Sequence, residues 1–367
     1  MTNRLKFPPK SAFFTAVRQR VDTHFTETGT HKHANTTMWI KTLLFLGVFF
    51  GCYMLIISGI LPALAMLGLA MLLGMFSAFV GFNICHDAIH GSFSANKHVN
   101  KALGLVFNLL GASPYIWNIS HNGVHHTFTN IPGHDEDLIV APGLIRIEED
   151  DPKRKIQRFQ HWYAFPLYGL ASLSWAFRKD FMKIFQKKIG QVAVKHPKKE
   201  YFNLFASKGL YYFLFIALPL LVLNITWWQF IIGFVAMHLA QGLTMGLVFQ
   251  LAHVVEETDF PTANPTGTME EAWAEHQMHT TANFSSESRI AAFFLGGLNQ
   301  QIEHHLFPKV CHVHYAKIGK IVKQTAQEYG LPYIESPTLF SAMRSHYRVL
   351  KKFAREAAPS KINYKAA

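Results

Sequence analysis

Cysteine is nearly absent from this chain of 367 residues. Cys52, Cys85 and Cys311 are its three cysteines, and no CxxC pair occurs. The count and spacing exclude a disulfide-stapled scaffold and an iron–sulfur cluster of ordinary spacing. The chain also lacks a glycine-rich dinucleotide fingerprint following a strand. Any electrons that the protein uses must therefore come from a separate partner.

Charged residues are also scarce. They make up 16% of the chain, against about 25% in soluble domains. Residues 42–85 and 209–252 contain no Asp, Glu, Lys or Arg, and each stretch is 44 residues long. A membrane-spanning helix needs about 20 apolar residues, so each stretch fits two helices, with turns at 58–62 and 223–226. We therefore predict an all-α integral membrane protein with four transmembrane helices in two hairpins, rather than a soluble protein with buried core helices.

Both predicted turns lack Lys and Arg. The basic residues lie in 1–41, 153–158, 187–199 and the C-terminal tail. The positive-inside rule then predicts that both termini and the central segment are cytoplasmic. The formal net charge of +12 suits an anionic lipid surface and requires no nucleic acid. No cleavable signal peptide is recognisable before Trp39.

These patterns divide the chain into five parts. We predict a cytoplasmic N-terminal arm (1–41), a transmembrane hairpin (42–85) whose second helix ends near residue 83, a cytoplasmic region (86–208), a second hairpin (209–252) and a cytoplasmic C-terminal region (253–367) with one helix near 314–329. The apolar segment 102–117 is short and interrupted by glycine and proline, which favours a re-entrant or interfacial helix. The basic segment 179–199 is predicted to be a helix, lying either on the membrane surface or against the cytoplasmic domain.

Histidine is abundant, with 21 residues, and three clusters lie at the edges of the apolar segments. They are HDAIH (86–90), HNGVHH (121–126) and QIEHH (301–305). Positions i and i+4 share a helix face, so a HxxxH pair offers two imidazoles to one point. One such pair would be commonplace, but three clusters predict a shared metal centre in a cytoplasmic helical cap. The predicted ligands from the clusters are His86, His90, His121, His125, His126, His304 and His305.

Seven imidazoles are too many for one zinc ion, which takes four ligands, and they suit two metal ions with open positions. His253, the first residue after the second uncharged stretch, is predicted as an eighth ligand. Gln301 mirrors a ligand position and is predicted to bind weakly or through a water molecule. Asp87 and Glu303 are predicted outer partners that hold an imidazole by its other nitrogen. His134 is assigned to a polar loop near the site. Four histidines without a partner in their own segment are predicted not to be ligands: His276, His279, His312 and His314.

The three clusters, in this order and around two hydrophobic hairpins, resemble the histidine boxes of the membrane fatty-acid desaturases. The resemblance covers about residues 83–333 and is most specific at LNQQIEHHLFP (298–308). Gln301, in place of a histidine, is similar to the front-end branch, which desaturates between an existing double bond and the carboxyl end. FQLAH (249–253) and TTANF (280–284) resemble that branch too. Many of its members carry a haem domain with a His-Pro-Gly-Gly motif, which this chain lacks.

The resemblance implies two iron ions, dioxygen, a fatty acyl chain linked to coenzyme A or to a lipid, and a separate electron donor such as a ferredoxin or a cytochrome-type protein. The active site would lie on the cytoplasmic face of the membrane. Trp117 and Trp273 are candidates for the substrate wall. Helix residues that either line an acyl tunnel or simply pack are Phe76, Phe79, Leu243 and Phe249. His238, inside the fourth helix, has either a functional or a hydrogen-bonded structural role.

Two other functions remain open at this point. A hydroxylase with the same di-iron centre shares the first hydrogen abstraction, and product analysis separates it from a desaturase. A membrane metal transporter or sensor would have ionisable ligands spread through its spans. Here the predicted spans contain His238 alone, and the clusters lie at their ends.

Overall fold

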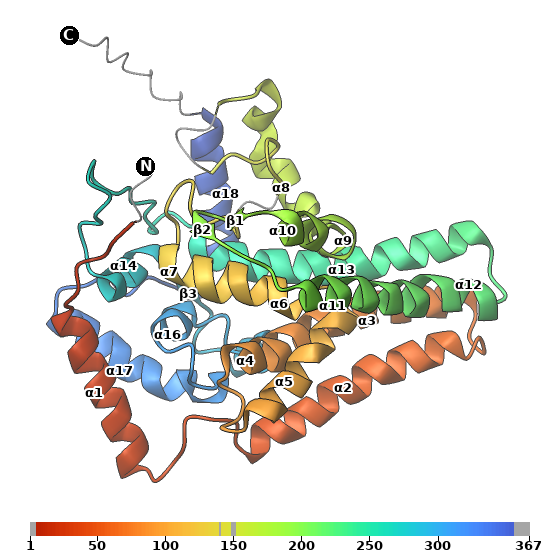
Figure 1. The fold of residues 1–367 in the computed structure, drawn as a ribbon, viewed down its shortest axis with the longest axis horizontal. Helices are drawn as coiled ribbons and strands as arrows, with labels where there is room; N and C mark the ends of the chain where they lie inside the picture. The colour runs from red at the N-terminus through yellow and green to blue at the C-terminus, as the bar shows by residue number, and fades with distance from the viewer. Residues whose placement is uncertain (1–4, 139–140, 148–151, 356–367) are drawn as a thin grey trace.

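The protein is described by a computed structural model that covers residues 5–138, 141–147 and 152–355. Arg4 and the end of the basic C-terminal tail lie outside these ranges. Four long apolar helical segments project side by side from a broader helical part (Figure 1). Within the described residues, the segments long and apolar enough to cross a membrane are Thr36–Ile57, Ala63–His90, Lys198–Val222 and Trp227–His253. The prediction of an all-α protein with four transmembrane helices is therefore confirmed in its coarser form: the described chain is mostly helical, with short strands, and has four helical segments that could cross a membrane.

Two of the four segments are single helices and two contain a π-helical turn. The single helices are α2 (Thr36–Ile57) and α13 (Trp227–His253). The second segment joins α3 (Ala63–Val80), a π-helical turn (Gly81–Cys85) and α4 (His86–His90). The third joins α11 (Lys198–Tyr212), a π-helical turn (Phe213–Ala217) and α12 (Leu218–Val222).

Two helix boundaries differ from the sequence prediction. The second helix does not end near residue 83 but continues to His90, so the first histidine cluster is the last turn of a membrane helix. The third helix begins at Lys198 rather than at Gly209. Lys198, Lys199 and Glu200 lie in its first helical turn, where they do not interrupt the helix. Lys208, directly before the uncharged stretch, is buried in an ion pair with Asp180.

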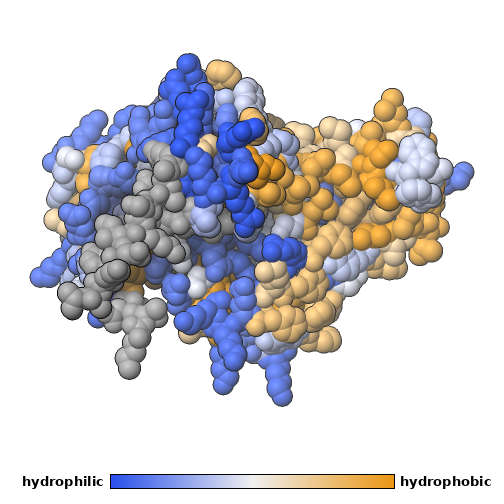
Figure 2. Space-filling view, turned by 90° about the horizontal axis from the view of Figure 1, so that it is seen from above, coloured by the Kyte–Doolittle hydropathy of each residue, from blue (hydrophilic) through white to orange (hydrophobic). Residues whose placement is uncertain are grey.

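Close backbone contact holds α13 against α3 and against the segment at Gly169. A Cβ atom at Gly74 of α3 would collide with the carbonyl oxygen of Met237, and one at Gly242 of α13 would collide with the carbonyl oxygen of Gly169. Small residues allow helices in lipid to approach each other in this way. The outer faces of α3 and α12 are apolar and exposed, as at Leu64 and Leu221. Figure 2 shows hydrophobic residues gathered over the projecting half of the molecule and hydrophilic residues over the other half.

The segment between the first two histidine clusters is bent. α5 (Lys97–Leu105) continues into a 3₁₀ turn (Val106–Leu110), and α6 (Pro114–Trp117) starts after Gly111–Ser113 at an angle of 108° to it. Gly111 has a φ of 85°, and Ser113 caps α6 by accepting from the Ile116 backbone. This bend agrees with the predicted re-entrant or interfacial segment and returns the chain to the level of α4.

The remaining elements form the broader part of the molecule. Before residue 200 they are α1 (Ala12–Glu27), a π-helix (Asn118–His125), α7 (His126–Phe128), a 3₁₀ helix (Lys155–Phe159), α8 (Gln160–Tyr168), α9 (Ala171–Ser174), a π-helical turn (Trp175–Lys179), α10 (Asp180–Phe185), β1 (Lys188–Ile189) and β2 (Val192–Ala193). After α13 they are α14 (Trp273–Thr280), β3 (Asn283–Phe284), α15 (Arg289–Leu295), α16 (Gln301–Leu306), a 3₁₀ helix (His312–His314), α17 (Tyr315–Glu328), β4 (Glu335–Ser336) and α18 (Leu339–Arg355).

Two predictions for this part need correction. The single helix predicted over 179–199 is wrong, because α10 ends at Phe185 and β1 pairs with β2 in an antiparallel hairpin around Gly190. Gly190 has a φ of 55°. A two-residue hairpin turn requires a positive φ of this kind, which glycine adopts readily. The C-terminal region contains the predicted helix as α17, and also α18, which the sequence analysis missed.

Candidate metal centre

Four separate segments bring the histidine clusters to one place. α4 follows the membrane helix α3, and Gly91, with a φ of 76°, ends it directly after His90. The second cluster lies on the π-helix Asn118–His125 and on α7, the third on α16, and His253 is the last residue of α13. These segments meet at the base of the projecting helices (Figure 1).

The eight predicted histidine ligands are all buried and fall into overlapping groups. In each group, one possible ligand atom per residue lies within 4.8 Å of the others. The groups are His86, His90, His121 and His304; His125, His253 and His305; and His126, His304 and His305. The third group shares His304 with the first and His305 with the second, so it joins them. The arrangement offers two adjacent positions for metal ions.

The ring nitrogens of these histidines divide into two kinds. Of the ring nitrogens of these eight histidines, those that are buried without a hydrogen-bond partner among the described residues are the Nε2 atoms of His86, His90, His125, His253, His304 and His305 and the Nδ1 atoms of His86 and His126. A buried polar atom without a partner costs free energy, so this many at one place indicate a missing ligand. Metal ions fit, because neutral imidazoles bind them and the orphaned nitrogens converge.

On the outer side, protein groups hold several rings by the other nitrogen. His125 Nδ1 lies 2.8 Å from Asp135 Oδ2, and His305 Nδ1 lies 2.7 Å from Gln277 Oε1. His304 Nδ1 is 3.3 Å from the Tyr315 hydroxyl, and His253 Nδ1 is 3.3 Å from the Thr280 carbonyl oxygen. Such partners fix the tautomer and leave Nε2 with a lone pair for a metal.

Burial lowers the pKa of His304 and His305 well below the usual histidine range, and the neighbouring imidazoles lower it further. Both side chains are therefore neutral at physiological pH, which is the form that binds metal ions.

The two carboxylates inside the clusters have different surroundings. Asp87 Oδ1 lies 3.6 Å from His86 Nδ1, while its Oδ2 accepts from His312 Nδ1 at 2.8 Å. Glu303 accepts from Asn283 Nδ2 at 2.9 Å and from the Tyr333 hydroxyl at 2.8 Å, so its hydrogen bonds go to neighbouring segments and not to an imidazole. Burial raises the pKa of Glu303 to about 7.

Sequence analysis missed most of the outer partners. Asp135 and Asp137 follow His134 in the segment GHDED, where a cluster of acidic residues close to the second histidine cluster was the available signal. Asp137 Oδ2 lies 3.6 Å from His121 Nδ1. Gln277 and Tyr315 gave no sequence signal, because only the fold brings α14 and α17 next to α16.

The histidines predicted not to be ligands have other partners. His276 Nε2 is 2.8 Å from the Thr129 carbonyl oxygen, His314 Nε2 is 3.0 Å from the His33 carbonyl oxygen, and His279 faces Asp259 and Glu271. His134 Nδ1 lies 3.1 Å from the Pro132 carbonyl oxygen.

His312, together with Asp87 and Cys311, has the spacing of a further metal group. Its Nε2, however, is 3.1 Å from Lys41 Nζ, and its Nδ1 faces Asp87. An ammonium group can only donate, so Nε2 accepts, Nδ1 carries the proton, and neither nitrogen is left for a metal.

His238 is hydrogen-bonded on both sides within the membrane helices. Its Nδ1 is 2.9 Å from Ser172 Oγ, and its Nε2 is 3.0 Å from the Tyr211 hydroxyl. Of the two roles considered for His238, the contacts fit the structural one.

A cavity of about 420 Å³ opens onto the histidines. One part of its wall is formed by His86, His121, His304, Gln301 and Trp117. Trp117 stacks on His121 with ring centroids 4.2 Å apart. The apolar part of the wall comes from the membrane helices and the bent segment, and includes Ala78, Phe82, Phe107, Leu110, Met245, Phe249 and Leu298. This shape suits a narrow apolar chain lying across the metal positions.

The other predicted wall residues lie elsewhere. Trp273 is not among the described residues that line this cavity, and its Nε1 donates to the His126 carbonyl oxygen at 2.9 Å. Phe76 and Phe79 pack in the core between α2, α3 and α15, and Leu243 faces outward.

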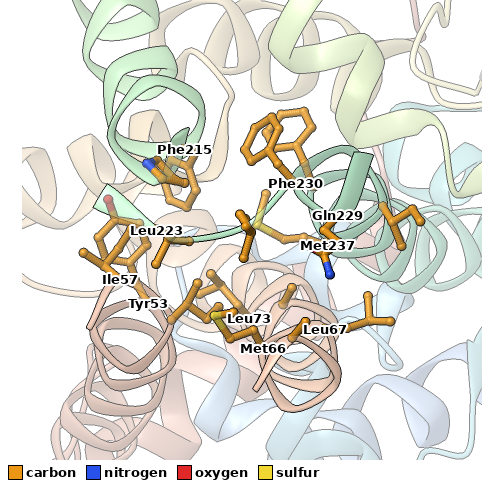
Figure 3. A pocket seen from close by; sticks show the side chains of 18 of the residues that line it. Tyr53, Ile57, Met66, Leu67, Leu73, Phe215, Leu223, Gln229, Phe230 and Met237 are labelled. Carbon is orange, nitrogen blue, oxygen red and sulfur yellow. The ribbon is translucent and has the colours of Figure 1, made fainter. Parts of the chain in front are cut away.

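A second cavity, of about 300 Å³, lies between the far ends of the membrane helices (Figure 3). Its lining is mostly apolar, with Ile57, Leu73, Phe215 and Met237 among the residues that face it. The hydroxyl of Tyr53 donates to the Leu214 carbonyl oxygen, and Gln229 accepts from the Thr226 backbone at the start of α13. Among the described residues, histidines and charged side chains therefore line the first cavity and not the second.

Comparison with known proteins agrees with this site. The profile of the fatty acid desaturase family matches residues 62–337. The chain belongs to the fatty acid desaturase family. It is 37% identical over 93% of its length to an acyl-lipid (8-3)-desaturase of Physcomitrium patens, covering 71% of that protein. It is 34% identical over 95% of its length to an sn-1 linoleoyl-lipid 6-desaturase of Synechocystis, covering 97% of it. An sn-1 linoleoyl-lipid 6-desaturase of Arthrospira platensis is 30% identical over 96% of the chain and is covered to 95%.

The desaturase is therefore an oxidoreductase that forms a double bond in a fatty acyl chain. The resemblance drawn from the three histidine clusters is confirmed, and the family relationship favours desaturation over the alternative of metal transport.

Proposed function

We propose that this desaturase acts on lipid-linked acyl chains and places the new double bond between an existing double bond and the carboxyl end. The observation that carries the proposal is a largely apolar cavity lined by His86, His121 and His304, whose buried histidine group adjoins the group of His125, His253 and His305. The names of the relatives, 6-desaturase and acyl-lipid (8-3)-desaturase, support the lipid-linked substrate and the position near the carboxyl end.

Two iron ions are the metals that we assign to the centre. His86, His90, His121 and His304 would hold one, and His125, His253 and His305 the other, with His126 between them. Gln301, which lines the cavity beside these rings, would bind weakly or hold a water molecule. Iron supplies the activation of dioxygen and the removal of hydrogen from two adjacent carbons. The protein's own task is to hold one such pair of carbons in place, because the C–H bonds of the chain are chemically alike.

We further propose the membrane arrangement predicted from the sequence. α2 with the helix of α3 and α4 forms one transmembrane hairpin, and α11–α12 with α13 forms the other. The histidine centre lies at the cytoplasmic ends of these helices, within a helical cap, so the active site faces the cytoplasm. The basic residues of 153–158 and 187–199 support this orientation.

Product analysis tests the proposed regiochemistry. Expression in a host that is fed a fatty acid with one existing double bond is expected to yield a product with a second bond on its carboxyl side. Gas chromatography–mass spectrometry of derivatised fatty acids locates the bond, and a His305→Ala variant serves as the inactive control. A bond on the methyl side would contradict the proposal, and a hydroxylated product would favour the hydroxylase.

A separate electron donor is expected to be necessary. The sequence offers no haem, flavin or iron–sulfur motif, so nothing in it relays electrons from a nicotinamide cofactor. Purified desaturase with dioxygen and NADPH is expected to give at most about one turnover per prior reduction. Adding a reduced ferredoxin, or a cytochrome-type protein with its reductase, is expected to restore sustained turnover. Sustained turnover without such a partner would contradict the prediction.

A further inference from the structure

One end of the histidine-lined cavity is charged. Arg178 and Lys179, at the end of the π-helical turn Trp175–Lys179, line it together with Lys183 of α10. Glu136 and Asp137 line it next to these cations. The same cavity therefore brings together a cluster of cations and carboxylates, the imidazoles and the apolar helices.

Lys183 differs from its neighbours in being buried with two long ion pairs but without a hydrogen bond to any described residue. Its side chain is 6% exposed, and its Nζ has no hydrogen bond among the described residues. The nearest carboxylate oxygens, on Glu136 and Asp137, are both 3.6 Å away. Lys179, by contrast, donates to Asp137 Oδ1 at 3.0 Å. An ammonium group has three N–H donors, and leaving them unpaired in a buried site is costly.

A second buried atom without a partner lies three residues farther along. Gln186 also lines the cavity, and its Oε1 is buried and lacks a hydrogen bond in the described structure. Two neighbouring polar groups without hydrogen bonds on one cavity wall indicate a polar ligand group that would lie between them. Since Gln186 Oε1 can only accept, an oxygen ligand would take its hydrogen bonds from Lys183 and, with the Gln186 amide turned about, from Gln186 Nε2.

This charged end is close to the metal positions. Lys183 Nζ lies 3.6 Å from Asp137 Oδ1, and Asp137 Oδ2 lies 3.6 Å from His121 Nδ1. The two oxygens belong to one carboxylate group, so Lys183 Nζ lies within roughly 10 Å of His121 Nδ1. Because Nδ1 faces Asp137, a metal ion would bind at Nε2, which adds roughly 4 Å and places the metal within roughly 14 Å of Lys183 Nζ. An extended acyl chain advances roughly 1.3 Å per carbon. With roughly 3–4 Å of contact distance at each end, at most roughly six carbons separate a group bound at Lys183 from the reacting carbons.

We propose that Lys183 binds the carboxyl oxygen of the acyl chain and thereby sets the distance from the carboxyl end to the new double bond. The ligand group is the carbonyl oxygen of an acyl ester or thioester, or the carboxylate of a free fatty acid. A phosphate bound there would leave too little length for the glycerol ester to reach the metals. This assignment rests on the proposed function and adds the residue that sets which carbons of the acyl chain lie beside the metal positions.

The test compares Lys183→Met with Lys179→Met and Lys183→Arg in membranes of an expressing host supplied with an electron donor. Lys183→Met is expected to raise KM by roughly tenfold, the effect of losing one hydrogen bond to a charged group. It is also expected to spread the product over more than one double-bond position while iron content stays unchanged. Lys183→Arg keeps the donors and is expected to restore most of the affinity. If the methionine variant does not fold, the arginine variant still tests the proposal, because it keeps the positive charge and the donors while changing their position.

The control and the substrate series separate the alternatives. Lys179→Met removes the hydrogen bond to Asp137, so it is expected to lower kcat and iron content without shifting the double bond. If Lys183→Met behaved in the same way, Lys183 would serve only Asp137, and the proposal would be overturned. Equal defects on a phospholipid, a galactolipid and an acyl-CoA support binding of the carboxyl oxygen. A defect confined to the phosphate-bearing substrates would refute it. A wild-type chain without activity on any of them would refute the proposed function itself.

Discussion

Replacing His253 with alanine is expected to remove about one iron ion per chain and to lower activity by at least roughly a hundredfold, since loss of an outer partner of a ligand already costs ten- to a hundredfold. His253 ends α13, is fully buried, and has an Nε2 without a partner. Its possible ligand atom lies within 4.8 Å of those of His125 and His305. Without His253, only two imidazoles of that group remain.

The measurement is the iron content of purified, folded protein together with turnover in membranes. His279→Ala is the matched control, because His279 is partly exposed and faces Asp259 and Glu271. The control is expected to keep its iron and its activity. If His253→Ala kept both as well, His253 would be an ordinary buried histidine bonded to the Thr280 carbonyl oxygen.

Replacing Lys208 with methionine is expected to destabilise the protein by about 3–5 kcal/mol, the cost of leaving one partner of a buried ion pair uncompensated. Lys208 Nζ lies 2.8 Å from Asp180 Oδ2 and donates to the carbonyl oxygens of Gly111 and Trp175 at 2.8 and 2.7 Å. Asp180 in turn accepts from the Ser113 backbone. One ammonium group therefore joins α11, α10 and the bend before α6.

Thermal unfolding in detergent, followed by intrinsic fluorescence, measures this effect. Lys199→Met is the control on the same helix, because its side chain is 76% exposed and its contact with Glu200 spans 3.8 Å. The control is expected to unfold at the wild-type temperature. A Lys208→Met variant with an unchanged melting temperature would show that water or lipid compensates the carboxylate.

The convergence of the histidine clusters could be predicted because each cluster is local in sequence and lies at the edge of an apolar segment. His86 and His90 share a helix face by spacing alone, and His253 was identified by its place at the end of an uncharged stretch. The grouping could not be predicted. His304 faces His86 and His90 while His305 faces His125 and His253, and that division depends on how α16 lies between α4 and α13. Adjacent residues on a helix point about 100° apart, so only the fold decides where each is directed.

Helix boundaries were predicted less well than the helices themselves. The uncharged stretches indicated four candidate membrane helices but not the extension of α11 to Lys198. The absence of charge marks only the apolar part of a helix, and charged residues are compatible with its end. Gly190-Gln191, flanked by Ile189 and Val192, carried a hairpin signal that the amphipathic pattern of 179–199 obscured. The outer partner Gln277 had no local signal, since only packing of α14 on α16 makes it one.

The ligand set draws on both ends of the family-matched region, from α4 to α16, and this has a consequence for how the protein is made. At synthesis rates of about 5–20 residues per second, on the order of ten seconds or more separate the translation of His86 from that of His304. Neither histidine group is complete before α16 has left the ribosome, since each includes a residue of that helix. All four apolar helices precede α16 in the chain and so are available for insertion first. If the proposed iron ions bind these groups, their delivery would follow the synthesis of all four apolar helices, and a ribosome-bound chain that ends before α16 would hold no complete site for them.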